Sequence, residues 1–160
     1  MAPQDQTRSD EGAQERLDRE LMELLNELRV TIPGVQVLFA FLLTVPFSQR
    51  FEQLSDRTVD IYFAAVLTSA VASILLIAPA AHHRLRFRDR AKEQMIRTAN
   101  FMALLGMGSL ALALGLAVYV VADLVYGGGN ARLAAAVVSG AAALIWFVLP
   151  HFYRSDHPKP

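Results

Sequence analysis

The chain alternates between charged segments and four long stretches that contain no Lys, Arg, Asp or Glu. These stretches are residues 30–49, 61–83, 98–122 and 133–153, with lengths of 20, 23, 25 and 21 residues. An α-helix rises about 1.5 Å per residue, so each stretch is long enough to cross a hydrocarbon layer of about 30 Å. The pattern predicts an all-α, four-helix transmembrane bundle with spans at about residues 32–48, 60–81, 97–125 and 131–152.

The remaining segments complete the predicted organisation. We expect a disordered tail over residues 1–13, a cytoplasmic amphipathic helix over 14–29, a membrane domain over 30–153 and a C-terminal tail over 154–160. Pro33 disfavours helical geometry at Ile32 and suits a first helical turn, which predicts a break there with Thr31 as the cap. Pro46 is expected to bend or end the first span.

The composition supports a membrane location. Only 19% of the residues are charged and 54% are apolar, whereas about a quarter of the residues in a typical soluble domain are charged. Residues 1–29 are acidic and hydrophilic, so we expect no cleaved signal peptide and an uncleaved first span that directs insertion. The absence of cysteine excludes a disulfide framework and a thiol nucleophile.

Basic residues predict the orientation. Twelve of the 15 Lys and Arg residues lie before the first span, between the second and third spans, or after the fourth, and three lie in the two other connections. The positive-inside rule then places both termini in the cytoplasm. The 13 arginines against two lysines are typical of a GC-rich bacterial genome, so the expected location is a bacterial plasma membrane.

The amphipathic helix has a regular apolar stripe. Leu17, Leu21, Leu24 and Leu28 recur at steps of four, three and four, but the segment holds fewer than two heptads, too few to predict a coiled coil. Residues 1–29 have a net charge of −4, and residues 82–97 have one of +4. The basic residues are Arg84, Arg86, Arg88, Arg90, Lys92 and Arg97. Two interpretations stay open: this segment contacts the N-terminal helix, in its own or a neighbouring subunit, or it binds anionic lipid headgroups.

Ionisable side chains inside a membrane are functional candidates, because a central charge costs roughly 2.5–3.5 kcal/mol on insertion scales. No such residue is central in this chain. Asp60 and Asp123 lie at the outer ends of their spans, with Arg57 and Arg132 nearby. They either form an outer cation or proton site or are solvated, ion-paired helix ends.

Two polar residues complete the candidate ion or proton pathway. Tyr119 lies one turn from Asp123 and is placed to share its hydrogen bonding. Gln36 lies about one turn inside the inner border of the first span, as Asn100 does in the third, so a hydrogen bond between them is a further possibility.

Small residues at four-residue steps predict close helix packing. The second span has Ala65, Ser69 and Ser73, the third Ser109, Ala113 and Ala117, and the fourth Ala135, Ser139 and Ala143. The first span is bulky and is expected at the periphery. These ridges also favour association with partner helices, as a homo-oligomer.

No catalytic motif is present: the chain lacks HExxH, GxSxG, a Walker motif and a Rossmann fingerprint. His82, His83 and His151 have no acidic or thiol partner at ligand spacing, so we predict no metal site. We also expect no cofactor and no nucleic-acid partner. The leading hypothesis is a non-enzymatic interaction, structural or regulatory protein of the membrane, and the alternative is a small ion or proton transporter or channel.

The first span and its flanks carry a family resemblance. Residues 23–29 read ELLNELR, residues 33–47 read PGVQVLFAFLLTVPF, and Arg50-Phe51 and His82-His83-Arg84 follow. Together these segments resemble a family of small four-span integral membrane proteins of unknown function from actinobacteria. Some members are labelled sodium/proton antiporters. The resemblance implies a four-span fold, and the family offers no established functional residues to transfer to this chain.

Overall fold

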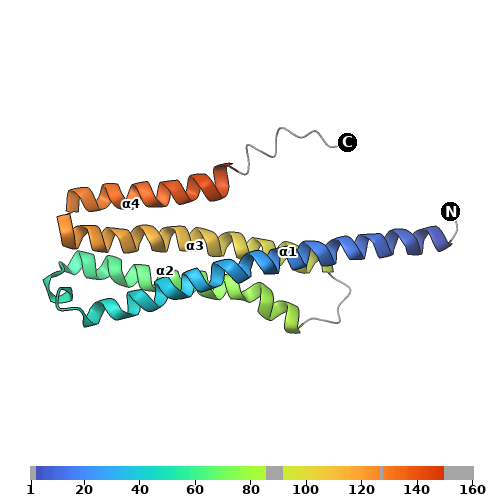
Figure 1. The fold of residues 1–160 in the computed structure, drawn as a ribbon, viewed down its shortest axis with the longest axis horizontal. Helices are drawn as coiled ribbons and strands as arrows, with labels where there is room; N and C mark the ends of the chain where they lie inside the picture. Colours follow the sequence, from blue (N-terminus) through green and yellow to red (C-terminus); the bar gives the residue numbers. More distant parts are fainter. Residues whose placement is uncertain (1–2, 86–91, 127, 150–160) are drawn as a thin grey trace.

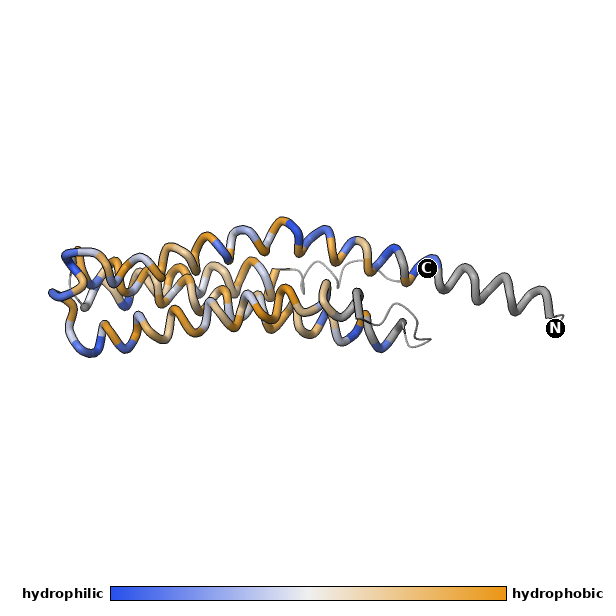
Figure 2. The backbone as a smooth tube through the Cα atoms, turned by 90° about the horizontal axis from the view of Figure 1, so that it is seen from below, coloured by the Kyte–Doolittle hydropathy of each residue, from blue (hydrophilic) through white to orange (hydrophobic). Residues whose placement is uncertain are grey.

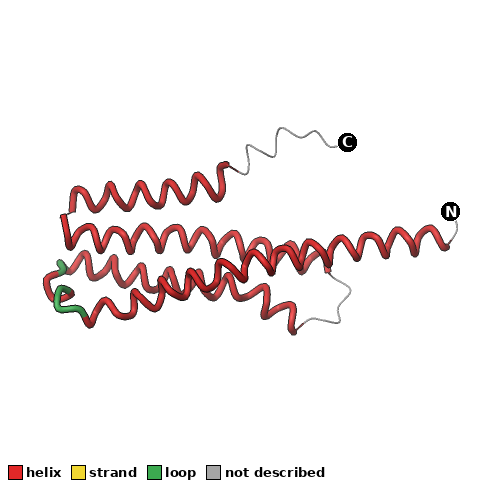
Figure 3. Tube along the Cα trace, in the orientation of Figure 1, coloured by secondary structure: helices red, strands yellow, loops and turns green. Residues whose placement is uncertain are grey.

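The structure is a computed structural model that describes residues 3–85, 92–126 and 128–149. Its main elements are four helices: α1 (Pro3–Thr44), α2 (Asp56–Leu85), α3 (Lys92–Tyr126) and α4 (Gly128–Ala143). The short 3₁₀-helices η1 (Val45–Phe47) and η2 (Phe51–Gln53) connect α1 to α2, and a π-helical segment, η3 (Leu144–Val148), continues α4. The described ranges contain no strand (Figures 1 and 3), which confirms the all-α prediction.

Each of the four helical segments is long and apolar enough to cross a membrane. The candidate spans are Glu15–Phe47, Asp56–Ala81, Ile96–Tyr126 and Gly129–Val148, and Figure 2 shows the apolar residues along the length of the bundle. The chain is therefore a multi-pass membrane protein. We call the end with η1, η2 and the α3–α4 connection the turn end, and the opposite end, where α1 begins, the tail end (Figure 1).

A heptad pattern joins α2 and α3. On each helix one series of buried residues alternates at steps of four and three, which is the spacing of knobs-into-holes packing in a left-handed supercoil. They are Thr58, Tyr62, Ala65, Ser69, Ala72, Leu76 and Pro79 in α2, and Ala99, Ala103, Gly106, Leu110 and Ala113 in α3. Most are small, so the backbones approach closely: a Cβ on Gly106 would lie 2.7 Å from Leu76 Cγ. This confirms the packing predicted for Ala65, Ser69 and Ala113.

The predicted break at Pro33 is not formed, because α1 is a single 42-residue helix. Its buried residues, Leu21, Leu28, Val35 and Leu42, are spaced seven apart through the proline, so one seam extends from Leu21 to Leu42. Pro33 itself is exposed. A proline frees the carbonyl four residues earlier, and on the outer face this disturbs no packing contact. Helix α1 is therefore held by side chains on both sides of the proline.

Two smaller corrections concern the same helix. Thr31 does not cap a new helix: its hydroxyl donates to the Glu27 carbonyl oxygen at 3.1 Å, a bond typical of a helix interior. Helix α1 begins at Pro3, within the segment predicted to be a disordered tail. Proline suits the first helical turn, and the following residues include good helix formers. Pro46 acts as predicted, since α1 ends at Thr44 and η1 follows.

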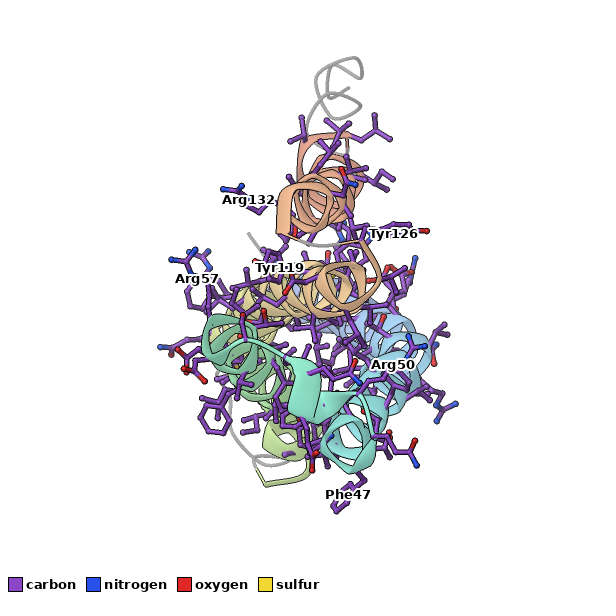
Figure 4. The ribbon with its side chains drawn as sticks, turned by 90° about the vertical axis from the view of Figure 1, so that its left-hand side faces the viewer. Phe47, Arg50, Arg57, Tyr119, Tyr126 and Arg132 are labelled. Carbon is purple, nitrogen blue, oxygen red and sulfur yellow. The ribbon has the colours of Figure 1, made fainter. Side chains whose placement is uncertain are left out.

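Helix α4 is an outlying element. Seen from the turn end, it lies on the far side of α3 from α1 and α2 (Figure 4). Only 11% of its spanning window is buried, as for α1, compared with 28% for α2 and 39% for α3. The α3–α4 contact is close, because a Cβ on Gly115 would overlap Ser139. The first span is thus peripheral, as predicted, and the fourth is equally so.

The π-helical segment changes which side of α4 faces α3. Residues 131, 135, 138 and 142 are buried or half-buried at steps of four and three, a spacing that would next bring Ile145 inward. A π-helical turn holds one extra residue, so the register shifts by one position. Ile145 is accordingly 56% exposed, and Trp146 packs against the cluster of Leu28, Val35, Leu76 and neighbouring residues instead.

Candidate functional site

A partly buried hydrogen-bond network links α2 to α3 at the turn end. The Thr58 hydroxyl donates to Asp123 Oδ2 at 2.6 Å, and the Ser55 and Thr58 hydroxyls are 2.9 Å apart. A hydroxyl has one hydrogen, so Ser55 is the donor to Thr58. The Thr58 backbone N–H also donates to Ser55 Oγ at 3.3 Å. Ser55 is therefore the N-cap of α2, and Thr58, only 1% exposed, passes the network on to Asp123.

The position of the Asp123 carboxylate favours a structural role. It is bonded within the first turn of α2, where the helix dipole stabilises a negative charge, typically by about 0.3–1 kcal/mol. The half-buried Asp123 lies near the end of α3, so the network joins the beginning of one spanning helix to the end of the next. This arrangement fastens the two helices together, because the Asp123 carboxylate on α3 accepts the hydrogen bond of a hydroxyl on α2.

The structure does not join Asp60 and Tyr119 to this network. Asp60 is exposed on α2, and Asp123 is bonded to Thr58 instead. Tyr119 is half-buried and packs against an apolar cluster that includes Leu42, and no hydrogen bond connects it to Asp123. From the turn end, the nearby cations Arg57 and Arg132 project from the same side of the molecule (Figure 4). The described contacts thus do not link Asp60 to Asp123, and the outer ion site stays a prediction.

Gln36 and Asn100 are not hydrogen-bonded to each other. Both are exposed, and Asn100 lines a groove together with Leu24, which is about three turns of α1 before Gln36. The predicted bond depends on the charge-free stretches of α1 and α3 beginning at the same depth. They do not, because α1 continues without a break on the N-terminal side of Pro33 and places Leu24, rather than Gln36, beside Asn100.

Sequence reasoning missed a second buried contact at the turn end. The Tyr62 hydroxyl donates to the Leu42 carbonyl oxygen at 2.8 Å. In an α-helix the N–H of residue 46 would bond this oxygen, but residue 46 is proline and has none. Tyr62 therefore supplies the donor that Pro46 lacks, and its ring packs edge-on against Phe51 at 5.3 Å between centroids. Pro46 was the available signal, since a buried carbonyl four residues before a proline needs another donor.

At the tail end, the amphipathic stripe of α1 packs within its own chain. Leu21 and Leu28 are 6% and 5% exposed, and Leu24 packs against the same cluster as Leu28. The N-terminal part of α1 also lies beside the start of α3, where Arg97 lines a groove with α1 residues. Arg84 and Lys92 belong to α2 and α3, but their side chains are not described, and Arg86, Arg88 and Arg90 lie outside the described residues.

The side chains that the structure describes form no group of three His, Cys, Asp or Glu residues suited to a metal ion. The side chains of His82 and His83 are not described, and His151 lies outside the described residues, so the histidine prediction is not tested.

Comparison with curated proteins found no match, and comparison with solved structures found none either. Comparison with protein families found one match, a family of unknown function (DUF6328), over residues 10–150. The match covers all four candidate spans and the whole amphipathic part of α1, residues 14–29. The chain belongs to this family of unknown function, DUF6328.

Proposed function

We propose that the protein has no catalytic activity and acts by association in the membrane, with α4 contacting α4 of a second copy. A contrast between the two peripheral helices supports this proposal, since their spanning windows are equally exposed. The exposed face of α1 carries large side chains such as Val37, Phe41 and Phe47. The exposed surface of α4 also includes large residues such as Leu133 and Val137, but it presents Ala136, Gly140 and Ala143 beside them along one ridge.

A small-residue ridge suits a helix partner better than lipid. Lipid chains are as apolar as leucine, so helices associate in membranes through close van der Waals packing, which small residues permit. A Cβ on Gly140 would meet nothing within 4 Å, so the space over this ridge is open. Leu133 and Val137 are exposed beside the ridge and would pack on either side of a partner. Contact between two identical α4 ridges gives a closed, two-fold symmetric dimer.

Cysteine crosslinking tests the dimer directly, because the chain contains no cysteine and a single substitution gives a unique probe. We expect Gly140→Cys to form disulfide-linked dimers in native membranes under mild oxidation. Val37→Cys is the matched control, since Val37 is 70% exposed on α1. Equal crosslinking of the two variants, together with a monomeric mass in lipid, would refute the proposal.

Ion or proton transport, of a sodium/proton antiporter type, is the competing hypothesis. Its candidate pathway residues are Asp60, Asp123, Tyr119 and Gln36, and of these four Asp123 takes part in an inter-helix hydrogen bond within one subunit. A pathway would then have to form between subunits. Liposome flux separates the hypotheses: we expect no proton or sodium movement above that of empty vesicles. Flux that Asp123→Asn abolishes would favour transport and count against a purely structural role.

A further inference from the structure

A groove of about 320 Å³ lies between α1 and α3 near the tail end. Leu17, Glu20 and Leu24 of α1 and Ile96, Arg97 and Asn100 of α3 line this groove. The three apolar residues are half-buried, and the three polar residues are exposed. The groove thus combines an apolar floor with a polar rim that carries both a carboxylate and a guanidinium group.

The groove lies at the boundary between charged and charge-free sequence. Helices α1 and α3 both lead from the tail end towards the turn end, and Leu24 and Asn100 line the same groove. The last charge before the apolar stretch is Arg29 in α1 and Arg97 in α3. At about 1.5 Å per residue, α1 therefore carries charge about 12 Å further towards the turn end than α3 does. With the hydrocarbon border placed midway between the levels of Arg29 and Arg97, each lies about 6 Å from it, and the groove residues from Glu20 to Leu24 fall within a headgroup layer about 5–8 Å thick.

The charges at this level select the ligand chemistry. Glu20, Glu23 and Glu27 are exposed on α1, as are the cations Arg16, Arg19 and Arg29, but among these charged residues of α1 only Glu20 lines the described groove. Carboxylates at headgroup level repel anionic lipids and attract ammonium groups. On the opposite wall, Arg97 and the Asn100 amide supply donors for a phosphate. A guanidinium group has five N–H donors, so a partner within the protein still leaves donors for the phosphate.

We propose that this groove binds the headgroup of a zwitterionic phospholipid with a primary ammonium, of the phosphatidylethanolamine type. The ammonium contacts Glu20, the phosphate contacts Arg97 and Asn100, and the acyl chains start along Leu24 and Ile96. This site goes beyond the proposed α4 association, because it lies at the tail end between α1 and α3. It also differs from general attraction of anionic lipids to the basic segment, since it requires the carboxylate.

Native mass spectrometry of the detergent-solubilised full chain tests the site. Phosphatidylethanolamine, phosphatidylcholine and phosphatidylglycerol with identical acyl chains would be titrated separately, and the bound lipids counted by mass. We expect phosphatidylethanolamine to bind about fivefold more tightly than phosphatidylcholine, on the scale of a partly exposed ion pair. Glu20→Gln should remove this difference, and Arg97→Gln should weaken the binding of both lipids.

Glu15→Gln is the matched control, because Glu15 is exposed on the same helix and does not line the groove. It should leave the preference unchanged, and thermal unfolding of each variant would verify that it folds. Equal binding of the ethanolamine and choline lipids would overturn the proposal. Tightest binding of phosphatidylglycerol, unaffected by Glu20→Gln, would overturn it as well and assign lipid binding to the basic segment. The α4 crosslinking result does not depend on either outcome.

Discussion

Replacing Tyr62 by phenylalanine isolates one buried hydrogen bond at the turn end. The substitution keeps the ring and its edge-on contact with Phe51 and removes only the hydroxyl that donates to the Leu42 carbonyl oxygen at 2.8 Å. Both partners are buried, with Tyr62 at 7% and Leu42 at 2% exposure. The carbonyl then has no donor, because residue 46 is proline.

The expected loss in the free energy of unfolding is about 1–2 kcal/mol. Hydrogen bonds between membrane helices are worth roughly 0.6–1.7 kcal/mol, and leaving a buried polar group unpaired costs about 1–3 kcal/mol. The measurement is reversible unfolding of the purified protein in mixed micelles, followed by circular dichroism.

A double-mutant cycle with Pro46→Ala makes the reasoning refutable. Alanine restores the backbone N–H that bonds the Leu42 carbonyl oxygen in α-helical geometry. Tyr62→Phe should then cost less than about 0.5 kcal/mol, so the coupling between the two substitutions should be about 1 kcal/mol. An equal loss in both backgrounds would mean that the hydroxyl does not replace the missing donor.

Two further stability predictions use matched pairs in the same unfolding assay. Gly106→Ala should lose about 1–3 kcal/mol, because its Cβ would lie 2.7 Å from Cγ of the fully buried Leu76. Gly34→Ala, with nothing within 4 Å, should be neutral or gain up to about 1 kcal/mol, and similar effects of both would refute the close α2–α3 approach. Leu28→Ala should lose about 2–5 kcal/mol, while Val30→Ala, 80% exposed, should change stability by less than about 0.5 kcal/mol. Equal small losses would indicate that α1 is detached on the tail side of Pro33.

The four spans follow from the sequence because charge-free length is a property of the chain itself. Asp56–Ala81 and Ile96–Tyr126 lie within a few residues of the predicted second and third spans. The small residues also predicted close packing, since Ala65 and Ser69 allow a close approach whichever helix lies opposite them. Length and side-chain size could therefore be read from the sequence without knowing how each helix is rotated.

Features that depend on helix orientation could not be predicted in the same way. The effect of Pro33 depends on the face it occupies, and only the buried series that includes Leu28 and Val35 places it outward. The inward rotation of Trp146 depends on a π-helical segment that no local signal marked.

The candidate site residues depend on side-chain direction as well. Depth in the membrane suggests a pair of Asp60 and Asp123, but in the described contacts Asp60 is exposed and Asp123 bonds Thr58, so the outer ion site stays a prediction. Thr58 gives no signal of its own in the sequence, because a hydroxyl near a helix start is usually solvated. Depth can be counted along a sequence, whereas the direction of a side chain emerges only from packing.

The separate position of α4 has a consequence for biosynthesis. The buried residues of both clusters come from α1, α2 and α3, and among the described residues of α4 and η3 only Trp146 packs at the edge of one of them. Chains are synthesised from the N-terminus, so the three helices that complete these clusters leave the ribosome before α4 does. The last helix to be inserted is thus the one that the earlier three need least, and until it arrives the glycine surface of α3 at Gly115 faces the surrounding lipid.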